Sequence, residues 1–464
     1  MVLLLLTTFS CSVYADSPIR DVDLSLGVKK DTLQQVNVVL EVNGKLKLNA
    51  EGTQIVQVPV QINARLAYAE RWLQMGPSLR RAGKTVRAYQ DATATIVYRG
   101  KTPIKSALRT DRHLLVAAAS EPSDVTIFSP LGPLTRDELD LVNVPGNTAI
   151  LDDLLPGRQV RPGDKWKLTC PTLAPLLGLD TLADNQIECE LKRVEKNLAI
   201  VYLTGAVSGA VGGVASDIKI AAKYAYDLER RQITWLAVAF HENRSIGHAQ
   251  PGLDVAVRVR VAITPSQPAP MLQDSVLADL KLDATPATRL LELDAPGAGF
   301  HMLADRRWHA MIDQDDVVVL RLVDAGELVA QCNISPLPPL GQGQKFGMVE
   351  FQADIRRVLG ESFGEVNGAS ESENEDGIRA LRVVVTGTVA ELPIQWIYYH
   401  LSDQQGRRAS CVFTLESGLA KRFNAADQAL ISSFQFVKST GATRQPAAPE
   451  TAARPAGQGK GDVR

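Results

Sequence analysis

Val56-Gln-Val-Pro-Val-Gln-Ile-Asn-Ala-Arg-Leu-Ala-Tyr68 is the stretch of sequence that decides the fold. Apolar side chains occupy every second position from Val56 to Tyr68, and mostly polar ones alternate with them. Successive side chains of a β-strand point to opposite faces of a sheet, so this spacing predicts a strand of about 40 Å with one buried face. Pro59 has no N–H to donate, which predicts an edge position or a bulge there.

Strand-like runs continue on both sides of this stretch. They cover residues 35–42, 45–48, 85–99, 113–118, 124–128, 186–194, 198–205, 217–228, 232–242 and 254–263. The Asn43-Gly44 dipeptide between the first two runs predicts a hairpin, because both residues tolerate positive φ. Only two short helical patches interrupt the runs, at 149–155 and 173–177. We therefore expect an α+β protein whose residues 16–263 form a large curved antiparallel sheet or open barrel with few short helices.

A second domain is predicted at residues 299–437, after a Pro/Ala-rich linker at 264–298. Its clearest element is an amphipathic helix with Phe351, Ile355, Val358 and Leu359 on one face, ended by Gly360. An acidic loop is expected next, and then three strands at 378–389, 394–401 and 408–415 and a closing helix over 419–430. Residues 438–464 contain almost no apolar side chains and are predicted to be a disordered tail.

The order of elements in 299–437 resembles the PsbP-like α/β-sandwich. The stretches that carry the resemblance are Phe300–Leu303 with Trp308, Val349–Ile355, and Ala429–Phe436. The resemblance implies an antiparallel sheet flanked by helices, in a family known mostly for docking onto other proteins and without shared catalytic residues. The first domain resembles uncharacterised bacterial exported β-rich proteins that carry a Pro-Gly-Asp-x-Trp turn, here Pro162 to Trp166.

The first fifteen residues resemble a signal peptide, with an apolar run at 2–6 and small residues Val13 and Ala15 before an expected cleavage. Cys11 raises a minor lipoprotein alternative. No later stretch approaches the length of a transmembrane helix, so we expect an exported, periplasmic or secreted protein.

The cysteines allow two interpretations. Cys170 and Cys189 lie in the first domain, and Cys332 and Cys411 lie in the second. An exported protein can oxidise such pairs to disulfides, and the loop between 170 and 189 would contribute about 3 kcal/mol. Alternatively, all four are buried thiols that pack as small apolar side chains.

Charge and motifs exclude more functions than they select. Lys plus Arg number 50 against 52 Asp plus Glu, a net charge of −2 that indicates no nucleic-acid partner. Gly360-Glu-Ser362-Phe-Gly364 matches a nucleophile elbow, but that chemistry needs a strand before the serine and a helix after it. The glycines between 205 and 213 are followed by a strand, not by a phosphate-binding helix. No catalytic residue, cofactor site or metal ligand is predicted, and we interpret the protein as a non-enzyme.

One cluster, Arg306-Arg307-Trp308, is a possible partner contact, because Trp and Arg are common in interface hot spots. The alternative is that Trp308 fills the core of the small domain. The leading hypothesis is an envelope protein that acts as a docking or scaffold module for an unknown partner. The second is a carrier of a lipid or other apolar small molecule, for which Ala64, Ala88, Ala92 and Ala94 would leave room on the curved sheet.

Overall fold

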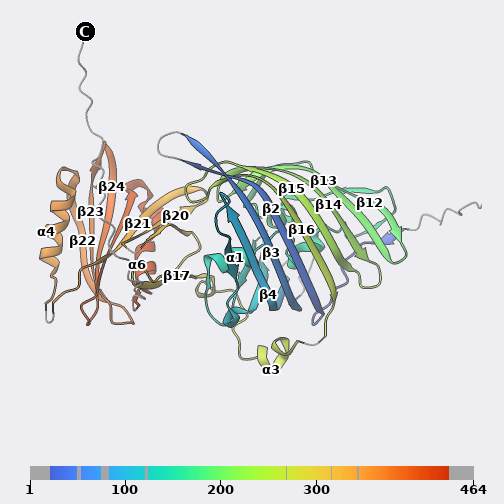
Figure 1. The fold of residues 1–464 in the computed structure, drawn as a ribbon, viewed down its shortest axis with the longest axis horizontal. Helices are drawn as coiled ribbons and strands as arrows, with labels where there is room; N and C mark the ends of the chain where they lie inside the picture. Colours follow the sequence, from blue (N-terminus) through green and yellow to red (C-terminus); the bar gives the residue numbers. More distant parts are fainter. Residues whose placement is uncertain are drawn as a thin grey trace, which may run out of the picture.

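The computed structural model describes residues 21–49, 54–74, 83–120, 124–267, 269–314, 316–341 and 344–437. Within these ranges the chain forms two β-sheet bodies that lie side by side, one built from the N-terminal half and one from the C-terminal third (Figure 1). The predicted signal peptide with Cys11 and the predicted tail lie outside the described residues. No helix in the described ranges is long and apolar enough to cross a membrane.

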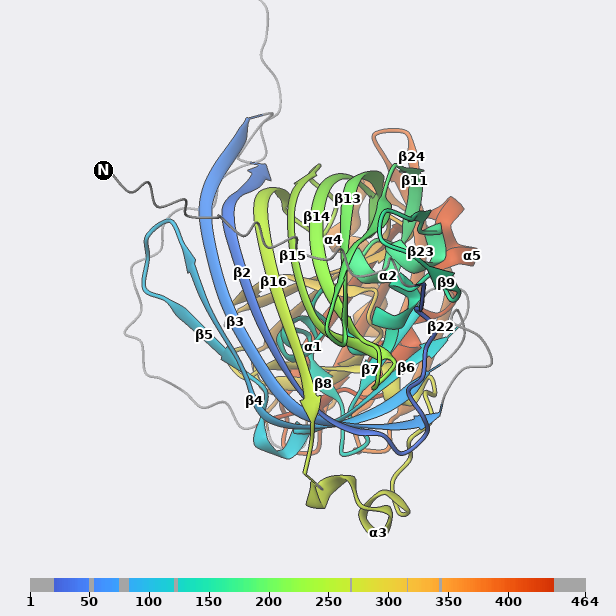
Figure 2. The same cartoon turned by 90° about the vertical axis from the view of Figure 1, so that its right-hand side faces the viewer.

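The N-terminal body is one large antiparallel sheet of 13 strands among the described residues. In spatial order its main path is β10 (Lys165–Lys167), β12 (Glu188–Glu195), β13 (Leu198–Val211), β14 (Val214–Asp227), β15 (Gln232–Arg244), β16 (Gly252–Pro265), β2 (Leu33–Asn49), β3 (Ile55–Gln74), β4 (Lys84–Tyr98), β6 (Leu114–Ser120) and β7 (Asp124–Phe128). Off this path, β11 (Thr181–Asn185) pairs with β13, and β5 (Ile104–Ala107) pairs with β4. The sheet is strongly curved but open, as the alternation in β3 and its neighbours predicted (Figure 2).

The inner face of this sheet is filled by the chain itself. Helix α1 (Arg136–Val142), the 3₁₀ turn η2 (Thr148–Leu154) and helix α2 (Cys170–Leu177) lie within its curve (Figure 2). Their apolar side chains, among them Leu139, Leu151 and Leu173, share one core with Leu66 of β3 and Val259 of β16. A short two-stranded sheet, β1 (Val22–Asp23) with β9 (Gln159–Val160), adds Val22 and Val160 to this core.

The predicted hairpin at Asn43-Gly44 is wrong. Both residues lie inside the continuous strand β2, where Gly44 pairs with Val60 on one side and Val255 on the other. A Cβ atom at Gly44 would lie 2.2 Å from the Asp254 carbonyl oxygen, so glycine is needed here for the close approach of β16. Tertiary pairing has overridden the local turn preference.

Pro59 pairs with Lys45 of β2 but has no register partner in β4, whose pairing with β3 begins at Val60, so the predicted edge position holds locally although β3 is otherwise paired on both sides. Its carbonyl oxygen accepts a hydrogen bond from Arg99 N–H at 3.1 Å, so the side of Pro59 that lacks an N–H faces the end of β4. Strand β4 ends at Tyr98, and the proline therefore costs the sheet no ladder bond.

A bulge in β4 decides which face each alanine takes. Ala67 pairs with Asp91 but Tyr68 pairs with Tyr89, so Gln90 is the extra residue. Ala64, Ala92 and Ala94 consequently contact the inner core, whereas Ala88 lies on the outer face. The expectation that all four alanines line one concave face is wrong for Ala88.

The stretch predicted as a linker is partly folded onto the sheet. It contains η3 (Pro270–Leu272), α3 (Asp274–Leu277), η4 (Ala287–Arg289) and β17 (Leu291–Ala295). Leu272 and Leu277 are buried against outer-face residues Val86 and Val116. This stretch covers one end of the outer face and is not a free spacer.

The C-terminal body is a seven-stranded antiparallel sheet among the described residues, with helices on both faces. Its spatial order is β19 (Trp308–Gln314), β20 (Val317–Asp324), β21 (Glu327–Leu337), β25 (Arg408–Glu416), β24 (Leu392–Ser402), β23 (Arg379–Val389) and β22 (Phe363–Glu373). Helix α4 (Met348–Leu359) packs Phe351 and Ile355 on one face. Helices α5 (Ala420–Phe423) and α6 (Ala426–Ile431) cover the other with Phe423 and Leu430.

Three details of this domain differ from the prediction. Val358 is 73% exposed and does not belong to the buried stripe of α4. The expected acidic loop after Gly360 is the edge strand β22, preceded by the 3₁₀ turn η5 (Gly360–Ser362). The closing helix follows another turn, η6 (Ser417–Leu419), and is interrupted at Asn424 and Ala425, which have φ of 47° and 57°.

A small four-stranded sheet joins the two bodies. It runs β26 (Gln435–Phe436), β18 (Phe300–Ala304), β17 and β8 (Leu134–Thr135). Strand β17 pairs with β18 in antiparallel fashion and with β8, just before α1, in parallel. The N-terminal and C-terminal bodies are therefore connected by backbone hydrogen bonding as well as by the chain.

Candidate functional site

The outer face of the large sheet carries a band of basic side chains. Successive register partners across five strands are Lys223, Ala237, Arg260, Val39 and Arg65, in β14, β15, β16, β2 and β3. Neighbouring strands lie about 4.8 Å apart, so the two arginines are about 10 Å apart. A parallel row places Arg258 beside Ala239 and Glu41. We call Arg65, Lys223, Arg258 and Arg260 the basic band.

Few of these charges are neutralised. Arg260 pairs with Glu41, with 3.1 Å between Nη2 and Oε1. Arg65 and Arg258 are exposed and have no ion-pair or hydrogen-bond partner among the residues that the structure describes. The ammonium group of Lys223 lies 5.9 Å from the ring centroids of both Tyr202 and Trp235. The band is thus a cationic surface with aromatic rings at one end.

The predicted cluster Arg306-Arg307-Trp308 lies at the domain junction, not on a free surface. Trp308 is 5% exposed and meets the ring of Phe413 edge-on, so the core alternative holds for this residue. Arg306 donates from Nη2 to the Ile127 carbonyl oxygen at 2.6 Å, which ties it to the N-terminal body. Arg307 remains partly exposed and donates to Asp305. Trp308 cannot contact a partner protein because its ring is inside the domain.

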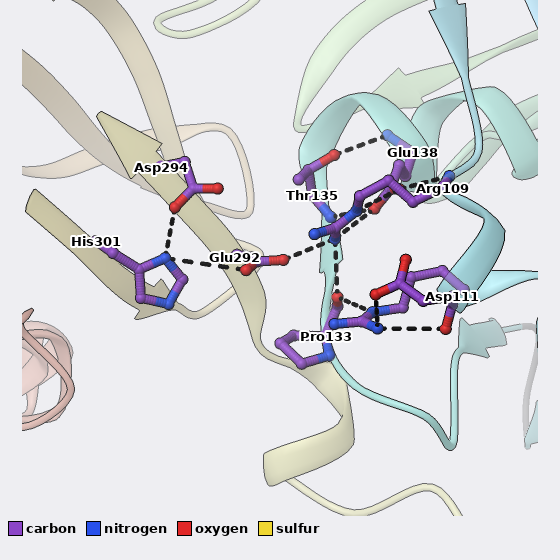
Figure 3. A network of polar contacts seen from close by, with 9 residues as sticks. Arg109, Asp111, Pro133, Thr135, Glu138, Glu292, Asp294 and His301 are labelled. Carbon is purple, nitrogen blue, oxygen red and sulfur yellow. Dashed lines mark hydrogen bonds and ion pairs between the residues drawn. The ribbon is translucent and has the colours of Figure 1, made fainter. Parts of the chain in front are cut away.

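The junction is held by a chain of charged groups (Figure 3). Arg109, after β5, donates from Nε and Nη2 to both carboxylate oxygens of Glu138, at 2.8 and 2.9 Å. Its Nη2 also lies 2.6 Å from Oε2 of Glu292 in β17. Burial alone would raise the pKa of Glu138, but the hydrogen bonds from Arg109 and Thr135 outweigh it and lower that pKa.

Beyond Glu292, Figure 3 shows two further groups, Asp294 on the same strand and His301 on β18. His301 Nδ1 lies 2.6 Å from Asp294 Oδ1 and 3.9 Å from Glu292 Oε1. One ligand atom from each of the three residues fits within 4.8 Å of the others. Two carboxylates and an imidazole nitrogen therefore converge at the junction.

Two hairpin turns also meet between the bodies. Gly213, between β13 and β14, and Gly326, between β20 and β21, have φ of 71° and 82°. A Cβ on Gly213 would lie 2.2 Å from the Cα of Gly326, so the backbones touch directly. Together with Gly205 and Gly209, which lie close to β11 and the segment after it, this glycine run serves strand packing and a turn.

A fully buried ion pair lies on the inner face. Arg87 Nε donates to Glu70 Oε1 at 2.8 Å, and both side chains are at most 2% exposed. Gln34 and Thr148 donate to the same carboxylate, at 2.6 and 2.7 Å. Because Thr148 belongs to η2, this network fastens the inner segment to the sheet.

The cysteines are not paired where the structure describes them. Cys189, Cys332 and Cys411 are free and buried, which corresponds to the buried-thiol alternative. Burial raises the pKa of Cys189 to about 12 and also raises those of Cys332 and Cys411, so all three stay protonated thiols. The side chain of Cys170 lies outside the described set.

Ser362 follows a helix and precedes a strand, because η5 connects α4 to β22. That order is the reverse of a nucleophile elbow. Among the residues that the structure describes, no hydrogen bond joins Ser362 to a histidine. His400, the histidine of β24, packs against the rings of Phe346 and Phe351. The elbow match therefore remains a helix C-terminus.

The core covers part of the inner face less completely. At the far ends of β2, β3 and β4, Val58 and Val60 are buried, but several other inward-facing apolar side chains are only half-buried. They are Val42, Leu46, Leu48, Val56, Ile62, Ile96 and Tyr98. We call this set the apolar rim.

Sequence reasoning missed helix α1 and the junction groups that it carries. Thr135 and Glu138 form a reciprocal capping box, with Glu138 N–H donating to Thr135 Oγ1 and Thr135 N–H donating to Glu138. The Thr-x-x-Glu pattern before an apolar run was a usable signal for this helix. Glu292, Asp294 and His301 come close to one another only through the register of two paired strands, and no local sequence pattern predicts that register.

Comparison with known proteins does not assign the chain to a family. No protein-family model matches the chain. No characterised protein sequence matches it either. DynF from the dynemicin pathway of Micromonospora chersina has 5% identity and a TM-score of 0.15, covering 58% of this chain and 96% of that one. The outer membrane protein OprD of Pseudomonas aeruginosa has 9% identity and a TM-score of 0.13, covering 86% and 96%. Likenesses this weak carry no argument about fold or function.

Proposed function

We propose that this protein is a non-catalytic, exported protein of the bacterial envelope that docks onto another protein through the outer face of its large sheet. The observation that carries the proposal is the unequal use of the two faces. The chain's own α1, η2 and α2 fill most of the inner face, whereas the outer face over β14 to β3 carries the exposed basic band. We also propose that the second domain is a PsbP-like α/β-sandwich, a view supported by α4 on one face of its sheet and α6 on the other.

The chemistry of the band defines the expected partner. Arg65, Arg258 and Arg260 project from the outer face of the sheet, and Tyr202 and Trp235 flank Lys223. Arginine and aromatic residues are enriched in protein interfaces, and cationic faces attract acidic partners. We therefore expect a protein with an acidic contact surface, bound more weakly at high salt.

Charge reversal tests this proposal. Immobilised protein carrying Arg258→Glu and Arg260→Glu is compared with wild type for binding of envelope proteins, quantified by mass spectrometry. The matched control is Arg356→Glu with Arg357→Glu, which makes the same charge change on the exposed side of α4. A partner kept by wild type and control but lost from the outer-face variant supports the proposal; equal retention by all three sinks it.

The apolar rim favours a second candidate, a carrier of a lipid or other apolar ligand. Half-buried side chains such as Ile62 and Ile96 offer a surface that an acyl chain would cover. Native mass spectrometry of protein from the envelope would show the bound mass, and Ile62→Arg should abolish it. A bound ligand that survives Ile62→Arg, or a ligand-free protein from the native source, speaks against the carrier.

Export and the absence of catalysis are tested separately. Mass spectrometry of the mature protein should show an N-terminus at Asp16; a lipidated Cys11 would support the minor alternative. Hydrolase screening of wild type and Ser362→Ala should give no difference. Turnover that disappears with Ser362 would make the protein an enzyme.

A further inference from the structure

We propose that Glu292, Asp294 and His301 bind a divalent transition-metal ion, with zinc as the expected ion, at the junction of the two β bodies. All three side chains belong to the antiparallel pair β17–β18 in the sheet that joins the bodies. This site was not visible in the sequence, from which no metal ligand was predicted. The proposal is independent of the docking function.

Strand geometry brings the three ligands together. Glu292 and Asp294 are two residues apart on β17, so their side chains leave the same face of the sheet. His301 is the direct register partner of Asp294 on β18. The ligand atoms consequently converge from two adjacent strands, and all lie within 4.8 Å of one another.

Electrostatics also favour a cation here. Glu138, Glu292 and Asp294 bring three carboxylates to the junction, and the guanidinium of Arg109 contacts only the first two. Oxygen Oε2 of Glu292 faces Arg109, while Oε1 faces His301 at a distance too long for a hydrogen bond. A bound cation would compensate the excess negative charge of Oε1 and Asp294.

The distances suit a metal after a small side-chain adjustment. Zinc bonds to nitrogen and carboxylate oxygen are about 2.0–2.2 Å, so tetrahedral ligand atoms lie about 3.3 Å apart. The observed separations from His301 Nδ1, 2.6 Å to Asp294 and 3.9 Å to Glu292, bracket that value. The Nδ1 proton that now joins His301 to Asp294 would leave as the metal binds.

The ligand types select the class of ion. Imidazole suits zinc, copper, iron and nickel, whereas calcium and magnesium prefer oxygen-only sites. The side chain of Asp294 is 54% exposed and that of His301 is 20% exposed, so water can complete the coordination and the ion can enter. We therefore expect a site with three protein ligands and at least one water.

The position of the site gives the ion a role in joining the bodies. Glu292 is paired with Thr135 in the short parallel contact between β17 and β8, and its second oxygen holds Arg109. An ion on Oε1 would fix the rotamer of Glu292 and thereby strengthen this contact. Binding that is confined to the folded state also raises the melting temperature.

The test uses the full chain without a histidine tag, stripped with EDTA and titrated with ZnCl2 in a calorimeter. His301→Ala and Asp294→Asn are the site variants. His241→Ala is the matched control, because His241 Nε2 also meets an aspartate, Asp254, at 2.9 Å but has no third ligand in the described chain. Circular dichroism checks that each variant is folded.

Wild type and His241→Ala should bind one equivalent of zinc, and Co2+ should give a visible absorption band from nitrogen–oxygen coordination. We expect His301→Ala to lose this binding and Asp294→Asn to weaken it by about 10–100-fold or more. Saturating zinc should raise the melting temperature of wild type by about 2–4 °C, but not that of His301→Ala. Equal zinc stoichiometry in wild type and both folded site variants, or no binding to wild type, would overturn the proposal.

Discussion

The two sheets of this molecule differ in how far helices cover their faces. The C-terminal sheet is covered on both sides, by α4 on one face and by α5 and α6 on the other, with aromatic rings such as Phe413 and Phe423 in contact. The N-terminal sheet is covered by chain on its inner face but mostly bare on its outer face. A mostly bare, cationic face beside a sheet that has helices on both faces is the reason why we propose binding on the N-terminal body.

Their interiors also respond to protons in opposite ways. The C-terminal interior contains His400, whose pKa is lowered to about 4 by burial and by nearby Arg408 and Arg379. The N-terminal interior contains Asp152 of η2, whose pKa is raised to about 7 by burial and by the neighbouring charge of Asp153. As the pH falls, the free energy of unfolding should therefore decrease for the C-terminal body and increase for the N-terminal body.

The largest expected effect comes from the buried ion pair. Glu70→Leu leaves Arg87 without its counter-ion inside the N-terminal core, and we expect a loss of about 3–5 kcal/mol of unfolding free energy. Urea unfolding followed by circular dichroism measures the loss. The double variant Glu70→Leu with Arg87→Met should recover most of the lost stability, since no unpaired charge is then buried. If the double variant is as unstable as Glu70→Leu alone, the ion pair itself stabilises the body, and the buried unpaired charge is not the cause of the loss.

Next in size is the acid response of the C-terminal body. The ring nitrogens of His400, 2% exposed, have no hydrogen-bond partner in the described chain. The folded pKa lies below the unfolded value of about 6.5, so only the unfolded chain binds the proton between pH 6.5 and 4. Stability should fall by about 3 kcal/mol across that window and not above it. His400→Leu should reduce this dependence, measured by urea unfolding at several pH values.

Asp152 predicts the opposite slope for the N-terminal body. Its folded pKa of about 7 exceeds the unfolded value, so the folded state takes up the proton first as pH falls from 7 towards 4, and stability rises. Asp152→Asn should stabilise this body by about 2 kcal/mol at pH 8, a figure reduced for partial solvent screening. Thermal unfolding of Asp152→Asn and of the outer-face control Asp91→Asn compares the two; an Asp152→Asn protein that is no more stable than wild type at pH 8 contradicts the assignment.

The success and failure of sequence reasoning follow the same contrast between faces. Strand β3 was predictable because one face is buried and the alternation is strict. Edge strand β22 was not, because its two faces are both largely exposed and polar, which leaves no period in its hydrophobicity. Strand β17 was lost inside the composition of a linker, although Leu291 and Leu293 alternate with acidic residues.

Long-range register explains what was missed at the sites. Gly44 serves a close strand approach that only the neighbouring β16 creates. His301 meets Asp294 because of the pairing between β17 and β18, and the basic band gathers residues from β14, β16 and β3 that are far apart in sequence. The capping box at Thr135 was, by contrast, a local signal that could have been used.

The smallest expected effect tests whether the bare face is free for binding. The double variant Arg65→Ser with Arg258→Ser removes two exposed side chains that have no partner in the described chain. If the outer face has no structural role, the unfolding free energy should change by less than about 0.5 kcal/mol. Urea unfolding at low salt measures the change, and partner binding in the same sample should fall. A loss of stability well above that figure would mean that these arginines hold the sheet itself, and the difference between a bare face and a covered one would no longer separate binding from structure.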